Sequence, residues 1–290
     1  TIYRSSLLFL TCVAILAVDF HVFPRRFAKT ETVGCGWMDL GAASFVVAAG
    51  MVSPQARHKP GKTHRPFQRI APVLVMGFLR LITHKGLEYQ EHASEYGIHW
   101  NFFFTLAFLT LLSASTSSRT PSWIAPVLIL VVYQTFLSFF GGQAWIETAP
   151  RNCNKGGAGM LCDLFVANRE GILGCIGYGA LYLMSEWIAY SFFWDEVKPM
   201  TLWIVVAALF VTWQLVVMAG VDVSRRTTNA AFCSWVLFVN LLQLVAIYTV
   251  VDWAGTSDVP PVLAAVNRHG LLTFVVANLL TGIVNLSINT

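Results

Sequence analysis

The sequence predicts an all-α fold, a polytopic bundle of transmembrane helices. Of its 290 residues, 56% are hydrophobic and only 12% are charged, whereas about a quarter of the residues in soluble domains are charged. The apolar segments are long and continuous, which favours helical spans over the short alternating strands of a barrel. Ten Trp and eight Tyr suit the membrane interface, where these rings lie at headgroup level.

Nine apolar runs approach the length needed to cross a hydrocarbon core of about 30 Å as helices. Proline, glycine and serine clusters separate the runs, as expected for turns. Because no soluble stretch can bury a core of its own, residues 1–290 are predicted to form a single transmembrane domain. The chain opens at Thr1 directly into the first run, so we expect spans to be missing at the N-terminus. The predicted spans are 4–20, 37–53, 69–83, 98–114, 121–140, 171–191, 201–220, 230–251 and 270–288.

The loop 54–69 sets the predicted orientation. It carries five basic residues and no acid, and the positive-inside rule therefore makes it cytosolic. Alternation places the loops 21–36, 84–97, 141–170 and 221–229 on the far side of the membrane. The last but one contains Cys153 and Cys162, which are expected to pair if that side is an oxidising lumen. The six cysteines show no C-x-x-C pair and no Cys/His spacing for zinc, so no metal site is expected.

The stretch Ala17 to Glu31, AVDFHVFPRRFAKTE, joins the first span to the first far-side loop. An apolar run ends at Asp19, and Lys29 follows after Pro24 has broken the helix. An ionisable group at the membrane boundary is costly and usually faces protein, water or a substrate. The alternative is a structural one, because acids and basic residues are common at the ends of spans.

Further polar residues of the far-side loops are candidate substrate ligands. A helical reading of the stretch after His84 puts Lys85, Glu88, His92, Glu95 and His99 on one face. Such a face would suit a headgroup cavity or a solvated connector. Arginine pairs hold phosphates well, although they also serve as topology signals. The candidates are Arg25, Arg26, Glu31, His84, Lys85, Asn101, Asn168, Arg169, Arg225, Arg226 and Asn229. A net charge of +4, spread over loops without interleaved aromatics, argues against nucleic acid.

Five motifs together resemble one family along nearly the whole chain. They are AVDFHVFPRRFAKTE, EYGIHWNFFFTL from Glu95, NREG from Asn168, SRR from Ser224, and the ending NRHGLLTFVVANLLTGIVNLSI. The sequence is similar to the glucosaminyl-phosphatidylinositol inositol acyltransferases of the PIG-W type. Family members have further spans before the acid-bearing one. The loops 54–69 and 192–198 are short for the family, which suggests that internal residues are missing as well.

The resemblance implies an enzyme of the endoplasmic reticulum membrane with lumenal catalytic loops. It would move a fatty acyl group, usually palmitoyl, from acyl-CoA to the inositol 2-hydroxyl of glucosaminyl-phosphatidylinositol, an early step of glycosylphosphatidylinositol (GPI) anchor biosynthesis. Its partners would be that lipid, acyl-CoA as a co-substrate and the bilayer, with no permanently bound cofactor. By motif position, Asp19 and Lys29 are the catalytic candidates.

The residue types suit this chemistry. A carboxylate partly withdrawn from water is a stronger base, so Asp19 would take the hydroxyl proton and Lys29 would stabilise the oxyanion or hold a phosphate. Reversed roles stay open, and His99, followed by His84 and His21, is the reserve base. A secondary transporter is the alternative from another class, and a non-catalytic scaffold is a third. The lack of a visible repeat and the gathering of polar residues at one surface argue against the transporter.

Overall fold

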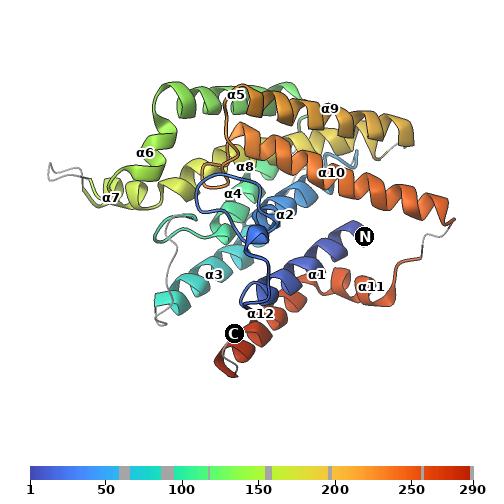
Figure 1. Ribbon diagram of the computed structural model, residues 1–290, viewed down its shortest axis with the longest axis horizontal. Coiled ribbons are helices and arrows are strands. Elements are labelled where there is room, and N and C mark those ends of the chain that lie inside the picture. Colours follow the sequence, from blue (N-terminus) through green and yellow to red (C-terminus); the bar gives the residue numbers. More distant parts are fainter. Residues whose placement is uncertain are drawn as a thin grey trace.

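The computed structural model describes residues 1–58, 66–85, 95–116, 118–153, 159–194, 198–255 and 258–287. All regular structure within these ranges is helical, with no strand (Figure 1). The α-helices are α1 (Ile2–Ala17), α2 (Leu40–Met51), α3 (Pro66–Lys85), α4 (Phe102–Ser115), α5 (Ile124–Phe139), α6 (Gly142–Thr148), α7 (Gly159–Ala167), α8 (Arg169–Phe192), α9 (Pro199–Met218), α10 (Ala230–Trp253), α11 (Pro261–Arg268) and α12 (Gly270–Ser287). Two short 3-10 helices, η1 (Arg25–Phe27) and η2 (Trp37–Asp39), lie between α1 and α2.

Each of the nine predicted runs contains a helix, but nine membrane spans are not confirmed. Four described helices, α8, α9, α10 and α12, are long and apolar enough to cross a membrane. The pair α5 and α6, bent by 69°, would make a fifth span. The apolar helices α1, α2 and α4 contain 16, 12 and 14 residues. At 1.5 Å per residue they reach only about 18–24 Å, which is less than the hydrocarbon thickness.

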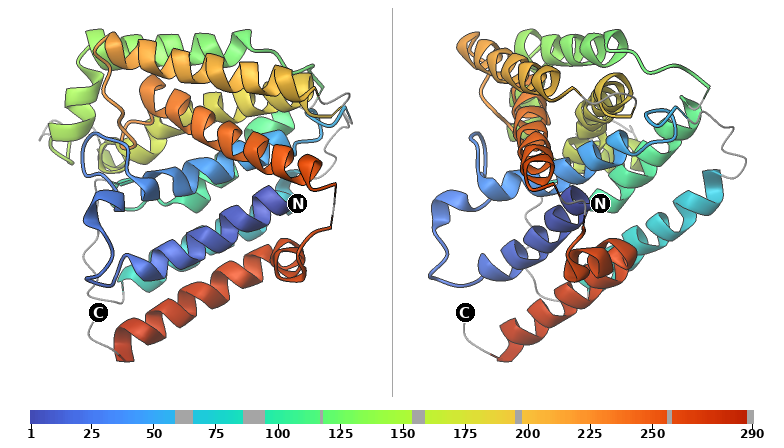
Figure 2. Two further views of the ribbon diagram at one scale, coloured as in Figure 1. Left: turned by 45° about the vertical axis from the view of Figure 1, so that its right-hand side comes forward. Right: turned by 90° about the vertical axis from the view of Figure 1, so that its right-hand side faces the viewer.

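Helix α8 is the centre of the bundle, and α2, α4, α5 and α10 pack around it (Figures 1 and 2). Its glycines allow close packing, because a Cβ at Gly177 would collide with the Thr228 backbone of the loop before α10. A Cβ at Gly50 of α2 would collide in the same way with the Tyr182 carbonyl of α8. Small residues at such contacts are typical of membrane helices, where association depends on close van der Waals packing. In contrast, only 11% of the apolar 18-residue stretch of α9 and 6% of that of α12 are buried, which suits lipid-facing helices.

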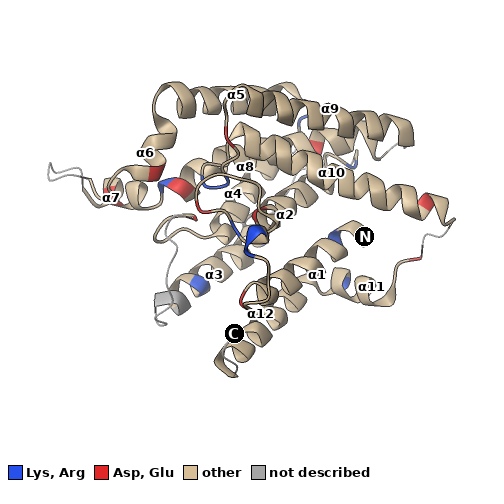
Figure 3. Ribbon diagram, viewed as in Figure 1, with Lys and Arg blue, Asp and Glu red and all other residues tan. Residues whose placement is uncertain are grey.

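The helix ends gather the loops on two sides of the bundle. In the left view of Figure 2, the loop before η2, the α6–α7 segment and the connection before α10 lie at one end. The α10–α11 connection lies at the other end. Hydrogen bonds from Gly34 N to Val223 O (2.8 Å) and from Ser224 Oγ to Thr32 O (3.3 Å) join two far-side loops directly. Most of the helical surface carries no charge, and much of the charge lies in these loops (Figure 3).

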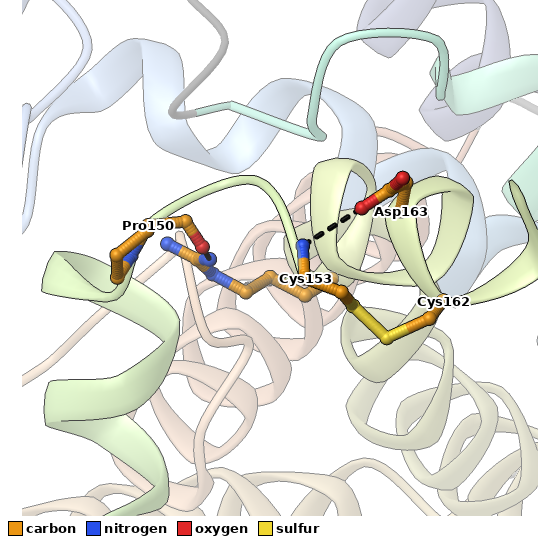
Figure 4. Close-up of a disulfide and its surroundings, with 5 residues drawn as sticks. Pro150, Cys153, Cys162 and Asp163 are labelled. Atoms are coloured by element: carbon orange, nitrogen blue, oxygen red, sulfur yellow. Dashed lines mark hydrogen bonds between the residues drawn. A yellow bond between two sulfur atoms is a disulfide. The ribbon is translucent and has the colours of Figure 1, made fainter. Parts of the chain in front are cut away.

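The predicted disulfide between Cys153 and Cys162 is confirmed (Figure 4). It links the segment after α6 to α7, and the Cys153 backbone N–H donates to Asp163 at 2.7 Å. Cys12, Cys35, Cys175 and Cys233 are free thiols. No group of three or more metal-ligating side chains was found among the described residues, and the expectation of no metal site stays a prediction for the whole protein.

Candidate active site

A cavity of about 560 Å³ lies between α1, α2, α4, α10 and α12. Its body is apolar and is lined by side chains such as Leu7, Phe45, Phe103 and Phe274. Along α1 the lining runs from Arg4 to Ile15, a distance of about 17 Å at 1.5 Å per residue. The volume falls within the range of about 300–1,000 Å³ that is typical of small-molecule sites, and the shape suits an extended acyl chain.

Five charged side chains gather at one end of this cavity: Lys29, Asp39, Arg80, Glu95 and Arg225. A sixth, Arg4 near the start of α1, also lines the cavity. Lys29 Nζ lies 2.7 Å from Glu95 Oε1, and Arg225 Nη1 lies 2.9 Å from the same oxygen. Arg225 Nε lies 2.8 Å from Asp39 Oδ1. Burial by itself raises the pKa of Glu95, but the cations Lys29 and Arg225 outweigh burial and hold that pKa below its usual value.

Asp39 shapes the loop that carries Lys29. Its carboxylate is 1% exposed and accepts hydrogen bonds from the Thr30 N–H (3.1 Å), the Thr30 hydroxyl (2.9 Å) and the Gly36 N–H (3.0 Å). Gly36 must be small because a Cβ there would collide with the Ala28 carbonyl. A turn closed by Asp39 therefore determines where the backbone next to Lys29 lies.

The structure places Asp19 apart from this charged end. Asp19 Oδ2 accepts a hydrogen bond from Asn285 Nδ2 of α12 at 2.7 Å, and Asp19 does not line the cavity. No hydrogen bond or ion pair joins Asp19 to Lys29 within the described part of the chain. Lys29 is brought to the cavity, whereas the catalytic role of Asp19 stays a prediction.

The other candidates of the first loop lie at the surface. Arg25 is exposed and donates to the Val18 carbonyl at 3.1 Å. Arg26 is exposed and stacks over the Phe27 ring at 5.0 Å. Glu31 and His21 are exposed as well. None of the four lines the cavity among the described residues. Substrate binding by Arg25, Arg26 and Glu31 and a role of His21 as reserve base therefore stay predictions.

Arg169 and Arg226 are tied into a second, buried ion network instead of the cavity. Glu170, whose side chain is fully buried, lies 2.6 Å from Arg151 and 2.9 Å from Arg226. Arg169 is 1% exposed, donates to the carbonyls of residues 146, 149 and 150, and lies 5.3 Å from the Trp145 ring. These contacts fasten α6 to the start of α8. They give both arginines a structural function, and phosphate binding by them stays a prediction.

The side-chain amides of three predicted asparagine ligands form hydrogen bonds with the protein backbone. Asn101 and Asn229 cap α4 and α10, accepting from Phe103 N at 3.0 Å and from Phe232 N at 2.9 Å. Asn168 precedes α8, is 3% exposed and accepts from the backbone N–H groups of His99 and Trp100. Such caps satisfy backbone donors that a helix start leaves open. An Asn just before an apolar run is a signal that could have identified the first two as caps.

The histidine candidates add little to the site. His99 is half-buried, and its ring does not line the cavity. The side chains of His84 and Lys85 lie outside the described residues, as do Glu88 and His92. Glu95, by contrast, was predicted only as one member of a polar face. Its partners Lys29 and Arg225 are 66 and 130 residues away in sequence, so no local pattern could have identified the cluster.

Comparison with known proteins identifies relatives of the whole chain. The model of the GWT1 family matches residues 1–290. The protein named GPI-anchored wall transfer protein 1 of Yarrowia lipolytica is 35% identical over 100% of this chain, and that of Schizosaccharomyces pombe is 34% identical over 100%. An uncharacterized protein of Arabidopsis thaliana is 36% identical over 99% of this chain. The chain spans 66% of the length of each of these three relatives.

Proposed function

The chain belongs to the GWT1 family, and from this we propose that it acylates the inositol ring of a GPI-anchor precursor. In the proposed reaction, the 2-hydroxyl of glucosaminyl-phosphatidylinositol attacks the thioester carbonyl of palmitoyl-CoA. An ester C–O bond forms, the thioester C–S bond breaks, and the coenzyme A thiol leaves with the proton that the hydroxyl gives up. The names of the fungal relatives, which refer to GPI-anchored wall transfer, support a place in this biosynthesis.

The observation that carries the proposal is the cavity with one charged end. Its apolar body, between α1, α2, α4 and α12, suits the fatty acyl chain. Its charged end holds Lys29 and Arg225 beside Glu95, and suits a phosphoinositol headgroup, which is polar and anionic. The thioester would then lie where the apolar and the charged linings meet.

Lys29 is proposed to stabilise the oxyanion of the tetrahedral intermediate, because among the described residues it is the lysine that lines the cavity. Arg225 is proposed to hold the phosphate of the lipid, since a guanidinium binds phosphate through two hydrogen bonds. Asp19 is proposed as the general base. This proposal for Asp19 rests on its position in the VDF motif, since Asp19 bonds Asn285 and does not line the cavity.

The proposed location is the endoplasmic reticulum membrane, with the charged end on the lumenal side. The disulfide between Cys153 and Cys162 supports an oxidising compartment at the end of the bundle where α7 and the loop before η2 lie. The helices long enough to span a membrane support a multi-pass arrangement.

The test is a microsomal assay with labelled palmitoyl-CoA and glucosaminyl-phosphatidylinositol in cells lacking the endogenous activity. The wild-type protein should form an inositol-acylated lipid, and Lys29→Ala and Asp19→Asn should each abolish it at normal protein levels. Glu147→Gln is the matched control. Among the described residues, the Glu147 carboxylate of α6 accepts a side-chain hydrogen bond only from Gln143. Wild-type activity in both variants would remove the pair from the mechanism. No product from well-expressed wild type would favour the transporter alternative.

A further inference from the structure

Lys29 is held at the cavity by two carboxylates that share one arginine. Four residues form a ring of contacts with it: Glu95, Arg225, Asp39 and Thr30. Glu95 contacts the ammonium of Lys29, Arg225 bridges Glu95 and Asp39, and Asp39 binds the backbone of Thr30, the next residue after Lys29. The contacts therefore close into a ring that begins and ends at Lys29.

Glu95 is the member of this ring that touches the lysine side chain. A single oxygen, Oε1, accepts from Lys29 Nζ at 2.7 Å and from Arg225 Nη1 at 2.9 Å. The Lys29 side chain is 49% exposed, whereas those of Glu95 and Arg225 are 23% and 13% exposed. A lysine with that exposure would sample many rotamers in water. Glu95 is itself held by Arg225, which is mostly shielded from solvent, so Glu95 limits the positions that the ammonium can take.

The second half of the ring fixes the backbone that carries the lysine. Asp39 is buried and accepts from both the N–H and the hydroxyl of Thr30. Arg225 Nε lies 2.8 Å from Asp39 Oδ1. The same guanidinium therefore supports the main chain beside Lys29 and the carboxylate that orients its ammonium. Loops that are distant in sequence converge here, which is the support that a precisely placed group requires.

We propose that Glu95 is a positioning residue that holds the Lys29 ammonium at the charged end of the cavity, with Arg225 and Asp39 supporting it. This inference rests on the proposed acyl transfer, in which Lys29 acts on the reacting carbonyl. Glu95 touches the lysine and does not react itself. Its loss should therefore slow the chemical step more than it weakens acyl-CoA binding, because a misplaced group costs rate even when the substrate is bound.

The kinetic test compares Glu95→Gln with wild type. The amide keeps the size of the side chain and removes its charge. We expect kcat to fall roughly 10- to 100-fold while KM for palmitoyl-CoA changes less than about threefold. Glu147→Gln, the same substitution at a site away from the cavity, should keep wild-type values of both constants. The melting temperature in detergent is measured in parallel, so that loss of folded protein is not read as loss of rate.

A second readout does not depend on activity. An amine-reactive reagent is added to the purified protein, and the labelling of Lys29 is followed by peptide mass spectrometry relative to exposed Lys198. In Glu95→Gln, Lys29 should label roughly two- to fivefold faster, in the range expected for loss of a partly exposed ion pair. Glu147→Gln should leave the ratio unchanged.

The outcomes separate the inference from the function on which it rests. Equal labelling of Lys29 in wild type and Glu95→Gln would overturn the contact. Faster labelling with an unchanged kcat would overturn the positioning role, as would a rise in KM without a fall in kcat. A wild-type protein without acyltransferase activity would overturn the proposed function and the catalytic part of the inference, even where labelling confirmed the contact.

Discussion

Gly41 offers a direct test of whether the cavity holds the acyl chain. It lies in the first turn of α2 and lines the cavity, and a Cβ added there would meet no atom within 4 Å. In Gly41→Leu, four carbon atoms would enter space that a long chain uses. If they exclude three methylenes at about 0.8 kcal/mol each, the lost binding energy is about 2.4 kcal/mol. This corresponds to roughly a 50-fold loss of acyl-donor binding.

The assay is acyl transfer from decanoyl-, lauroyl-, myristoyl- and palmitoyl-CoA in competition. Gly41→Leu should slow transfer from all four donors, because Gly41 lies two residues from Asp39 at the charged end of the cavity, where every acyl chain must pass. Gly282→Leu is the matched control, since Gly282 of α12 also has open space at its Cβ but does not line the cavity. Wild-type rates of transfer in Gly41→Leu would refute an acyl chain in this cavity.

Three further predictions concern stability. Glu170→Gln should lower the free energy of unfolding by about 3 kcal/mol, the lower end for a broken buried pair, because Arg151 is 25% exposed. The variant should therefore melt well below Glu147→Gln in detergent. Equal melting temperatures would contradict the ion network. Reductant should destabilise wild type by about 2–3 kcal/mol, given the short loop between Cys153 and Cys162, and should have no such effect on Cys153→Ser. Because the pKa of Glu95 is lowered in the folded protein, its charge stabilises the fold at pH values above the usual glutamate pKa. This contribution is lost as the pH falls through the pKa of Glu95 in the folded state. The gap in melting temperature between wild type and Glu95→Gln should therefore shrink in acid, and a gap that stays constant with pH would contradict the pairing.

Each predicted hydrophobic run contains a helix, because burial in lipid or protein demands long apolar segments, but the runs did not predict α6, α7 or α11. They predicted helix ends poorly. The run 37–53 yields the 12-residue α2 because Trp37 to Asp39 form a 3-10 turn that Asp39 closes over Gly36. The run 121–140 is followed by a bend of 69° and a further helix, α6, because Gly141 adopts a left-handed conformation with φ of 67°. Backbone turns of this kind do not change the hydropathy of the sequence, so the hydrophobic runs could not predict where these helices begin and end.

Adjacent residues in the SRR motif show why charge alone did not locate the site. Arg225 contacts Glu95 and Asp39 at the cavity, whereas its neighbour Arg226 contacts Glu170 and the carbonyls of α6. Two consecutive arginines thus serve different parts of the molecule. Their sequence context is shared, so only the positions of distant carboxylates distinguish them.

Glu95 and Glu170 differ in function: Glu95 orients a side chain at the cavity, whereas Glu170 stabilises the fold. Each carboxylate lies between two cations, so composition and pairing are alike. Glu170 is fully buried, and breaking its pairs leaves charges without solvent, which makes it a stabilising element once formed. Glu95 is partly exposed and lines the cavity, so its pair with half-exposed Lys29 adds little stability. A contact that contributes so little energy and yet fixes an ammonium beside an acyl-sized cavity is better explained by chemistry at that ammonium than by folding.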